Sequence, residues 1–259
     1  MRDRTWQTET DLERLKHLAH LLLGRDISPT KFSPLVVSHP FSDSGIVGIR
    51  DKDGRMKMAN LMDDSNAAEE WREQVGQQIR EAETALQLFI MVTKPYRMGF
   101  LKYAIPSLSE QDAAKLLIWA WTSSESPNSD PNLSKAKMLE LFCSIDPDKL
   151  MDEEEFKQFQ ELDDIVTIYR GVTSHNAKRV KALSWTLDPH TAEWFAHRFG
   201  EQGTVYQAQI RKEHIHALLL GRNESEVIVE PKHLMELTTM EMSMEPSGNQ
   251  NLSMTMGGI

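Results

Sequence analysis

The chain of 259 residues has a single cysteine, so no disulfide can form within it. A lack of disulfides fits a reducing compartment, and we expect a cytoplasmic protein. No apolar run approaches the roughly 18 residues of a membrane-spanning helix, and the N-terminal MRDRTWQTETDLERL lacks the apolar core of a secretory signal. We therefore expect no membrane partner. Cys143 lies in the apolar stretch LELFCSI with no histidine nearby in the sequence, which favours a buried thiol over a nucleophile.

Several functional motifs are also missing. The chain contains no GxGxxG, no Walker A pattern and no HExxH. Its nine histidines include two close pairs, His214 with His216 and His190 with His197, but neither pair has a matching third ligand in the sequence. We therefore expect surface or core histidines and no metal.

Charge separates the chain into unlike parts. The formal net charge is −10, which disfavours nonspecific binding to nucleic acid or membrane. Residues 166 to 232 nevertheless hold nine Lys or Arg against seven Asp or Glu. A nucleic-acid partner is therefore disfavoured for the whole chain and left open for this segment.

The first part of the chain, residues 1 to 164, is predicted to be mostly helical. Apolar residues recur at helical spacing, and the longest such pattern runs from about residue 65 to residue 92. Lys94-Pro95 is predicted to end this helix, because proline cannot continue one. The acidic helical part carries little information on function.

The second part changes to short β-rich runs, which read DIVTIYRGV, ALSWTL, GTVYQAQI, HALLL and SEVIVEP. One helix interrupts them and is entered through Asp188-Pro189, which suits an N-cap followed by proline in the first turn. Helices first and strands later indicate an α+β fold. We expect a β-rich core at residues 165–232 and a Met-rich tail at residues 233–259 that is flexible alone or ordered only against a partner.

NESEVIVEP places two glutamates one residue apart at the start of a β-branched run. In a strand Glu224 and Glu226 would share a face, so either both are solvated or a cation lies between them. Arg170 ends an apolar strand and suits phosphate or carboxylate, while Gly171 lets a ligand approach the backbone. An arginine that pairs with an acid at the sheet edge is the alternative.

Hydroxyl and aromatic side chains follow. Ser184 and Thr186 share a strand face, where their hydroxyls can orient a neighbouring carboxylate. Trp194 and Phe195, on the following helix, are most simply core residues, and one of them can instead form a wall against a flat ring.

In this order, these elements resemble the arginine, serine and glutamate (R-S-E) class of mono-ADP-ribosyltransferases, which includes bacterial toxins and vertebrate ecto-enzymes. The matching elements are IYRGV with Arg170, the SWT element, the DPHTAEWFAHRF helix and the E-x-E of NESEVIVEP. The resemblance covers about residues 165 to 231. It implies an ADP-ribosyltransferase-like split β-sandwich behind a helical N-terminal half, with NAD as co-substrate and no metal.

The resemblance also implies which residues bind NAD. Arg170 holds the phosphate region, Gly171 clamps the nicotinamide carboxamide through its backbone, and Phe195 helps to enclose the ring. Ser184 and Thr186, from the Ser-x-Ser/Thr element, complete the NAD-binding set.

Catalytic roles are implied for Glu226, Glu224 and Ser184. Ser184 orients Glu226, which binds the 2′-hydroxyl of the nicotinamide ribose and stabilises the oxocarbenium ion. Glu224 receives the acceptor and helps to deprotonate it. The sequence departs from the family pattern at Trp185, where a smaller residue is usual, in the KAL before the Ser-x-Ser/Thr element, and in the short loop before Glu224.

We therefore expect transfer of ADP-ribose from NAD to a macromolecule, with protein arginine preferred because a glutamate stands two positions before Glu226. By family analogy this is a bacterial or phage toxin or defence effector, whose helical half can receive an antitoxin or partner protein. Modification of an RNA or DNA base is one alternative, because the basic run NAKRVK can follow a phosphate backbone. A catalytically silent module that binds a partner is another.

Overall fold

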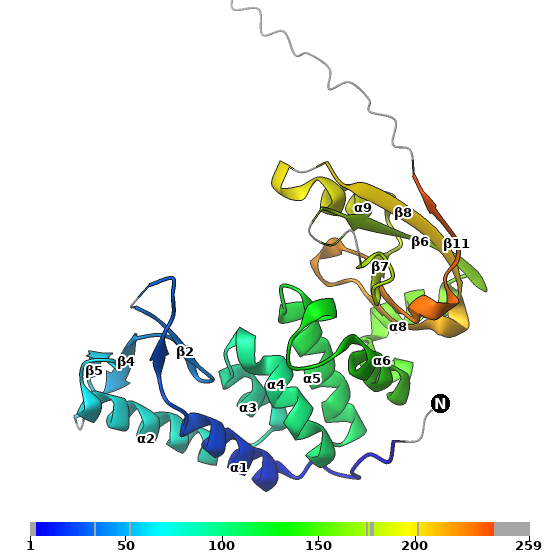
Figure 1. The fold of residues 1–259 in the computed structure, drawn as a ribbon. Coiled ribbons are helices and arrows are strands. Elements are labelled where there is room, and N and C mark those ends of the chain that lie inside the picture. The colour runs from blue at the N-terminus through cyan, green and yellow to red at the C-terminus, as the bar shows by residue number, and fades with distance from the viewer. Residues whose placement is uncertain are drawn as a thin grey trace, which may run out of the picture.

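The structure is a computed structural model that describes residues 4–33, 35–51, 53–174, 176, 179–200 and 202–240. It has an α+β fold, in which a mostly helical N-terminal region is followed by a six-stranded antiparallel sheet (Figure 1). No described helix combines the length and the apolar character that a membrane span requires.

The N-terminal region is built from helices joined by short connections. Their bounds are α1 (Leu12–Leu23), α2 (Ser65–Glu81), α3 (Ala85–Met91), α4 (Lys94–Ala104), α5 (Glu110–Ser123), α6 (Lys135–Ser144), α7 (Pro147–Leu150) and α8 (Glu153–Glu161). Between α1 and α2 lie five short strands, β1 (Ser28–Pro29), β2 (Val36–His39), β3 (Ser42–Ser44), β4 (Ile46–Arg50) and β5 (Met56–Asn60). The β4–β5 hairpin lies at the end of the molecule far from the large sheet (Figure 1).

The prediction of one long helix from residue 65 to residue 92 is wrong in one respect, because two helices, α2 and α3, cover this range. Ala82 is extended, and Thr84 opens α3 with a capping box completed by Gln87. Lys94-Pro95 does not end a helix but begins α4. Proline is tolerated there because the first N–H groups of a helix have no partner within it.

The C-terminal sheet holds strands in the order β11-β8-β6-β7-β10-β9. Their bounds are β6 (Ile165–Val172), β7 (Ser184–Thr186), β8 (Thr204–Arg211), β9 (Ile215–Leu219), β10 (Glu226–Val229) and β11 (Met235–Thr239). Strands β6 and β8 pair along their full length, but β6 and β7 pair only at Tyr169 and Thr186 among the described residues. The sheet therefore consists of two three-stranded halves joined at one narrow point, with α9 (Pro189–His197) packed on β6.

The range expected to form a flexible tail, residues 233–259, contains a strand. Strand β11 pairs with β8, with Met235 opposite Gln209 and Thr239 opposite Tyr206. The first part of that range is therefore an edge strand of the sheet, and residues 241–259 lie outside the described residues.

One continuous apolar core joins the helical region to the sheet. Trp121 of α5 packs edge-on against Phe142 of α6, with ring centroids 5.3 Å apart. The same cluster includes Leu218 of β9 and Val227 of β10, all of them buried. Helices α6, α7 and α8 also contact β9. These contacts fix the position of β9, which pairs with β10, the strand that begins with Glu226.

Candidate functional site

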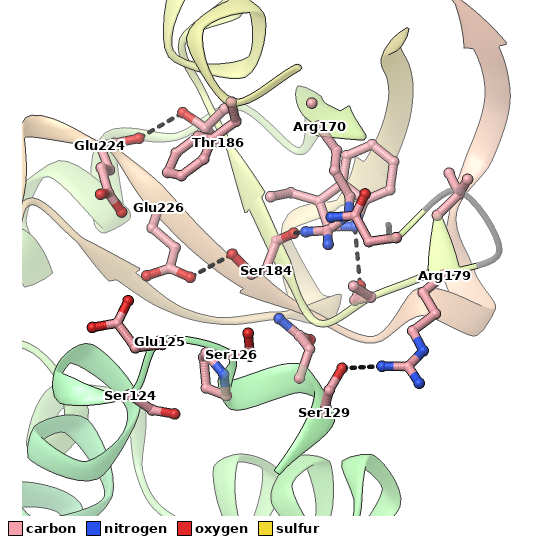
Figure 2. Close-up of a pocket in the computed structure, with 18 of the residues that line it drawn as sticks. Ser124, Glu125, Ser126, Ser129, Arg170, Arg179, Ser184, Thr186, Glu224 and Glu226 are labelled. Atoms are coloured by element: carbon pink, nitrogen blue, oxygen red, sulfur yellow. Dashed lines mark hydrogen bonds between the residues drawn. The ribbon is translucent and has the colours of Figure 1, made fainter. Parts of the chain in front are cut away.

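A pocket of about 1020 Å³ lies between the helical region and the sheet. The end of α5 and the loop after it, residues 122–129, line one side. Strands β6 and β7, helix α9 and the start of β10 line the other (Figure 2). The site is therefore made by both parts of the chain, although the sequence places every candidate residue in the second part.

Glu226, the first residue of β10, is buried, with only 7% of the residue exposed. Its Oε1 accepts a hydrogen bond of 2.5 Å from the hydroxyl of Ser184 and one of 3.1 Å from the indole N–H of Trp121. A buried charge is costly unless hydrogen bonds replace its lost hydration. The two donors offset that cost and fix the position of one carboxylate oxygen at the edge of the pocket.

Sequence reasoning missed Trp121. It is 1% exposed and lies on α5 within the apolar run KLLIWAWT, where a tryptophan is ordinarily a core residue. Its polar N–H reaches Glu226 only because α5 packs against the sheet. No local pattern in the sequence distinguishes it from Trp119, two residues earlier.

Glu224 and Glu226 do not share a strand face as the alternation of a strand predicts. Glu224 precedes β10 in a helical backbone conformation (φ −94°, ψ −12°), and Ser225 has a positive φ of 43°. The hydroxyl of Thr186 donates a 2.6 Å hydrogen bond to the carbonyl oxygen of Glu224, which fixes this turn. Both carboxylates nevertheless line the same pocket, reached from a turn and a strand rather than from one face.

Arg170 comes from β6 and also lines the pocket. Its Nη1 donates to the carbonyl oxygen of Ser184, while its Nε has no hydrogen-bond partner among the described residues. The pKa of Arg170 is lowered to about 10, mainly by burial; the Glu226 carboxylate opposes this change, and the nearby Arg198 adds to it. The guanidinium therefore stays charged at neutral pH, with part of its donor capacity left for a ligand.

Gly171 is required by packing as well as by any ligand. A Cβ at this position would lie 2.0 Å from the carbonyl oxygen of Ala192 and 2.6 Å from the backbone nitrogen of Ala196. Strand β6 can approach α9 this closely only where no side chain intervenes. Gly171 also lines the pocket. The sequence predicts that a ligand approaches this backbone closely, but α9 already lies against one side of it.

The two neighbouring aromatic residues of α9, Trp194 and Phe195, differ in burial. Trp194 is 62% exposed, so core packing is wrong for this residue. Phe195 is half-buried, and the two ring centroids lie 5.0 Å apart in an edge-to-face arrangement. Both rings line the pocket, and the guanidinium of Arg198 lies 5.2 Å from the Phe195 ring centroid. The pocket thus has a flat apolar wall beside its charged groups.

Charge is divided along the pocket. Figure 2 shows the carboxylates of Glu125, Glu224 and Glu226 toward one end and the guanidinium groups of Arg170 and Arg179 toward the other. Four further cations line the pocket, namely Lys94, Lys135, Lys181 and Arg198. In a chain of net charge −10, this concentration of cations favours an anionic ligand at one end.

The loop after α5 supplies two residues that the sequence presents only as loop composition. Glu125 is exposed and points its carboxylate into the pocket (Figure 2). The hydroxyl of Ser129 accepts a hydrogen bond from Arg179, part of the basic run that follows β6. This contact closes the pocket between the loop and the sheet.

Comparison with known protein families, with curated proteins and with solved structures finds no match to this chain.

Proposed function

We propose that the protein is a mono-ADP-ribosyltransferase that moves ADP-ribose from NAD to a macromolecular acceptor. The observation that carries the proposal is the buried Glu226 carboxylate, fixed by Ser184 in the same pocket as Arg170. The motif resemblance assigns these three residues to the reaction. The narrow junction between β6 and β7 also supports the split β-sandwich that the resemblance implies.

The divided charge of the pocket suits NAD. Its pyrophosphate is anionic and would lie at the end that holds Arg170 and Arg179, while its nicotinamide ring would lie against Phe195. The bond between the ribose C1′ and the nicotinamide nitrogen breaks, and nicotinamide leaves with the electron pair. Glu226 stabilises the positive charge that develops on the ribose, an interaction that is strongest in the transition state.

Arginine is the acceptor that the carboxylate end favours. Glu125, Glu224 and Glu226 together provide negative charge for a guanidinium. Glu224 would take its proton as the new bond to C1′ forms. Arg179 and Lys181, which also line the pocket, favour instead a nucleic-acid acceptor, which is the second candidate. Both candidates share the NAD chemistry and differ in the product.

The first test uses NAD labelled in the ADP-ribose part together with a cell lysate. Wild type is compared with Glu226→Gln, which keeps the shape of the side chain but not its charge, and with Glu213→Gln, an exposed glutamate outside the pocket, as the control. We expect Glu226→Gln to lower labelling about 100-fold or more and Glu213→Gln to leave it unchanged. Label removed by protease identifies a protein acceptor, and label removed by nuclease identifies a nucleic acid.

The second test separates the two glutamates. Glu224→Gln should abolish transfer to arginine while some hydrolysis of NAD to ADP-ribose and nicotinamide continues, because Glu226 is intact. Unchanged transfer in Glu224→Gln would refute the arginine assignment. If wild type binds NAD in calorimetry but releases no nicotinamide, the protein is a binding module and not a transferase.

A further inference from the structure

A second cluster of reactive side chains lies outside the pocket, at the junction of the helical region and the sheet. Cys143 of α6, His216 of β9 and Glu230, which follows β10, converge on one point. The Cys143 Sγ lies 3.3 Å from the Nε2 of His216, and this Nε2 lies 3.2 Å from the Oε1 of Glu230. The Sγ and the Oε1 are 3.9 Å apart. None of the three residues lines the pocket.

These distances match the spacing of ligands around a tetrahedral zinc ion. Bonds of about 2.3 Å to sulfur and about 2.0 to 2.2 Å to nitrogen and oxygen place the ligand atoms about 3.4 to 3.6 Å apart. Each observed separation differs from that range by about 0.3 Å or less. Thiolate, imidazole and carboxylate are all ligands that zinc accepts.

Hydrogen bonding accounts for this arrangement less well. The Nε2 of His216 has either one proton or one lone pair, yet it has two partners within 3.3 Å. A metal ion at the centre satisfies all three groups together. The side chains of His216 and Glu230 are 14% and 15% exposed, so the point is shielded from water but reachable.

The surroundings fit the same role. Lys232 Nζ lies 3.0 Å from the Oε2 of Glu230, which leaves Oε1 for the ion. The rings of His214 and His233 stack 3.5 Å apart beside this carboxylate, and the Nδ1 of His214 lies 4.0 Å from Oε1. Because His214 does not belong to the converging group, the cluster offers three protein ligands, and the fourth position of a tetrahedral ion would be open to water.

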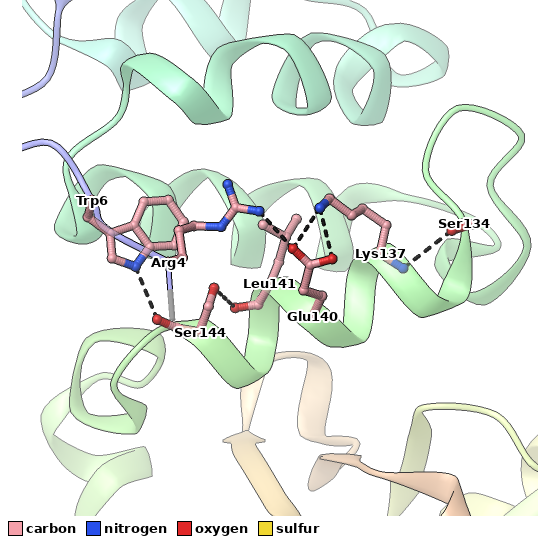
Figure 3. Close-up of polar contacts among 7 residues, drawn as sticks. All are labelled: Arg4, Trp6, Ser134, Lys137, Glu140, Leu141 and Ser144. Atoms are coloured by element: carbon pink, nitrogen blue, oxygen red, sulfur yellow. Dashed lines mark hydrogen bonds and ion pairs between the residues drawn. The ribbon is translucent and has the colours of Figure 1, made fainter. Parts of the chain in front are cut away.

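The helix that supplies Cys143 also contacts the N-terminal segment of the chain. The indole N–H of Trp6 donates a 3.0 Å hydrogen bond to the carbonyl oxygen of Ser144, and Arg4 pairs with Glu140 at 2.8 Å (Figure 3). The end of α6 is thus fixed beside β9. An ion at the cluster would join α6 to β9 and to the end of β10, the strand that begins with Glu226.

We propose that Cys143, His216 and Glu230 form a zinc site of three protein ligands that links the helical region to the six-stranded sheet. Removal of the ion should loosen the packing of α6 on the sheet rather than remove a group from the pocket. The site therefore stands independently of the function proposed above.

The test uses full-length protein without a histidine tag, kept reduced. After equilibration with zinc and removal of the excess, elemental analysis should give about one zinc per chain, and the metal should raise the unfolding temperature. Cys143→Ser and Glu230→Gln should each weaken zinc binding more than tenfold. His190→Ala removes a histidine that is 88% exposed and outside the cluster, and it should bind zinc as wild type does.

Cobalt binding by wild type provides a second test, which does not depend on whether any variant folds. Wild type loaded with Co²⁺ should show a thiolate-to-cobalt charge-transfer band, because Cys143 is the only cysteine of the chain. Cobalt binding without that band would show that Cys143 is not a ligand and would overturn the proposal. So would wild type that binds no zinc, or folded Cys143→Ser that binds zinc as tightly as wild type.

Discussion

Trp121 and Glu226 lie 105 positions apart in the chain and are joined by a 3.1 Å hydrogen bond from the indole Nε1 to the carboxylate Oε1. The donor belongs to the helical region and the acceptor to the sheet. The helical region is thus part of the site and not only a device for delivery or support. A fragment of the sheet alone would leave this carboxylate with one donor fewer and without the wall formed by residues 122–129.

Replacing Trp121 with Phe should slow nicotinamide release without greatly changing the KM for NAD. The indole N–H positions Glu226 from behind, and Trp121 is not among the residues that line the pocket. A hydrogen bond to a charged group contributes about 1.5 to 3 kcal/mol, so we expect kcat to fall about 10-fold or more. Steady-state assays of nicotinamide release measure both constants.

The matched control is Trp119→Phe, on the same helix. Trp119 is 39% exposed, and its indole contacts Arg97 and Phe89 rather than the carboxylate. This variant should keep the wild-type kcat. Equal kcat values for both variants and wild type would show that the Trp121 hydrogen bond has no positioning role.

From the sequence, the only site residues that could be predicted are those whose position depends on a single strand. Arg170, Ser184 and Glu226 stand on short strands, whose alternation and β-branched neighbours are visible in the sequence. Trp121 reaches Glu226, and Glu125 reaches the pocket, only because α5 packs against the sheet, which no local pattern encodes. The turn at Ser225 was also missed, because a positive φ at a serine has no reliable sequence signal.

The same limit explains why the sequence suggests no metal ligand set. Cys143 and His216 are 73 positions apart, and His216 and Glu230 are separated by 14. Cys143 is half-buried and in contact with a histidine, contrary to the buried thiol expected from its apolar neighbours. The fold class was accessible because helical periodicity and β-rich runs are local properties, whereas ligand sets gathered from three elements are not.

Replacing Gly171 with Ala should destabilise the fold. The added Cβ would lie 2.0 Å from the carbonyl oxygen of Ala192, so β6 and α9 would have to separate. Overpacking of this kind costs about 3 kcal/mol or more when backbone atoms must move. Gly221→Ala is the control, because a Cβ there meets no atom within 4 Å. Urea unfolding measures both variants, and equal stability would contradict the close packing of β6 on α9.

Ser184 and Trp121 should act as one unit, because both donate to the Oε1 of Glu226. Loss of either hydrogen-bond donor frees the carboxylate. Removing the second donor should therefore lower kcat less in a protein that already lacks the first than it does in wild type. We expect the double variant Ser184→Ala with Trp121→Phe to lower kcat by less than the product of the single effects. The coupling energy should be about 0.5 to 3 kcal/mol. Strictly multiplicative effects would mean that the two donors act separately.

Asp188 should make the stability of α9 depend on pH. Its carboxylate accepts hydrogen bonds from the Thr191 hydroxyl at 2.7 Å and from the backbone N–H groups of His190 and Thr191 at 3.0 Å each. The Thr191 hydroxyl is the main cause of a lowered Asp188 pKa, against the raising effect of burial, and the backbone donors add to it. The ionised form is therefore favoured by folding.

The sign of the effect follows from that lowered pKa. Stabilisation by Asp188 is complete above the ordinary aspartate pKa of about 3.9 and is lost as the pH falls through the lower value of the folded protein. Asp188→Ala should cost about 1 kcal/mol in the free energy of unfolding at about pH 7, as for other N-caps. That difference from wild type should become smaller as the pH falls below about 3.9. Asp163→Ala, at an exposed position before β6, should change little at about pH 7 or about pH 3. Urea unfolding at both pH values measures the three proteins, and a cost of Asp188→Ala that stays constant down to about pH 3 would exclude the charged cap as its cause.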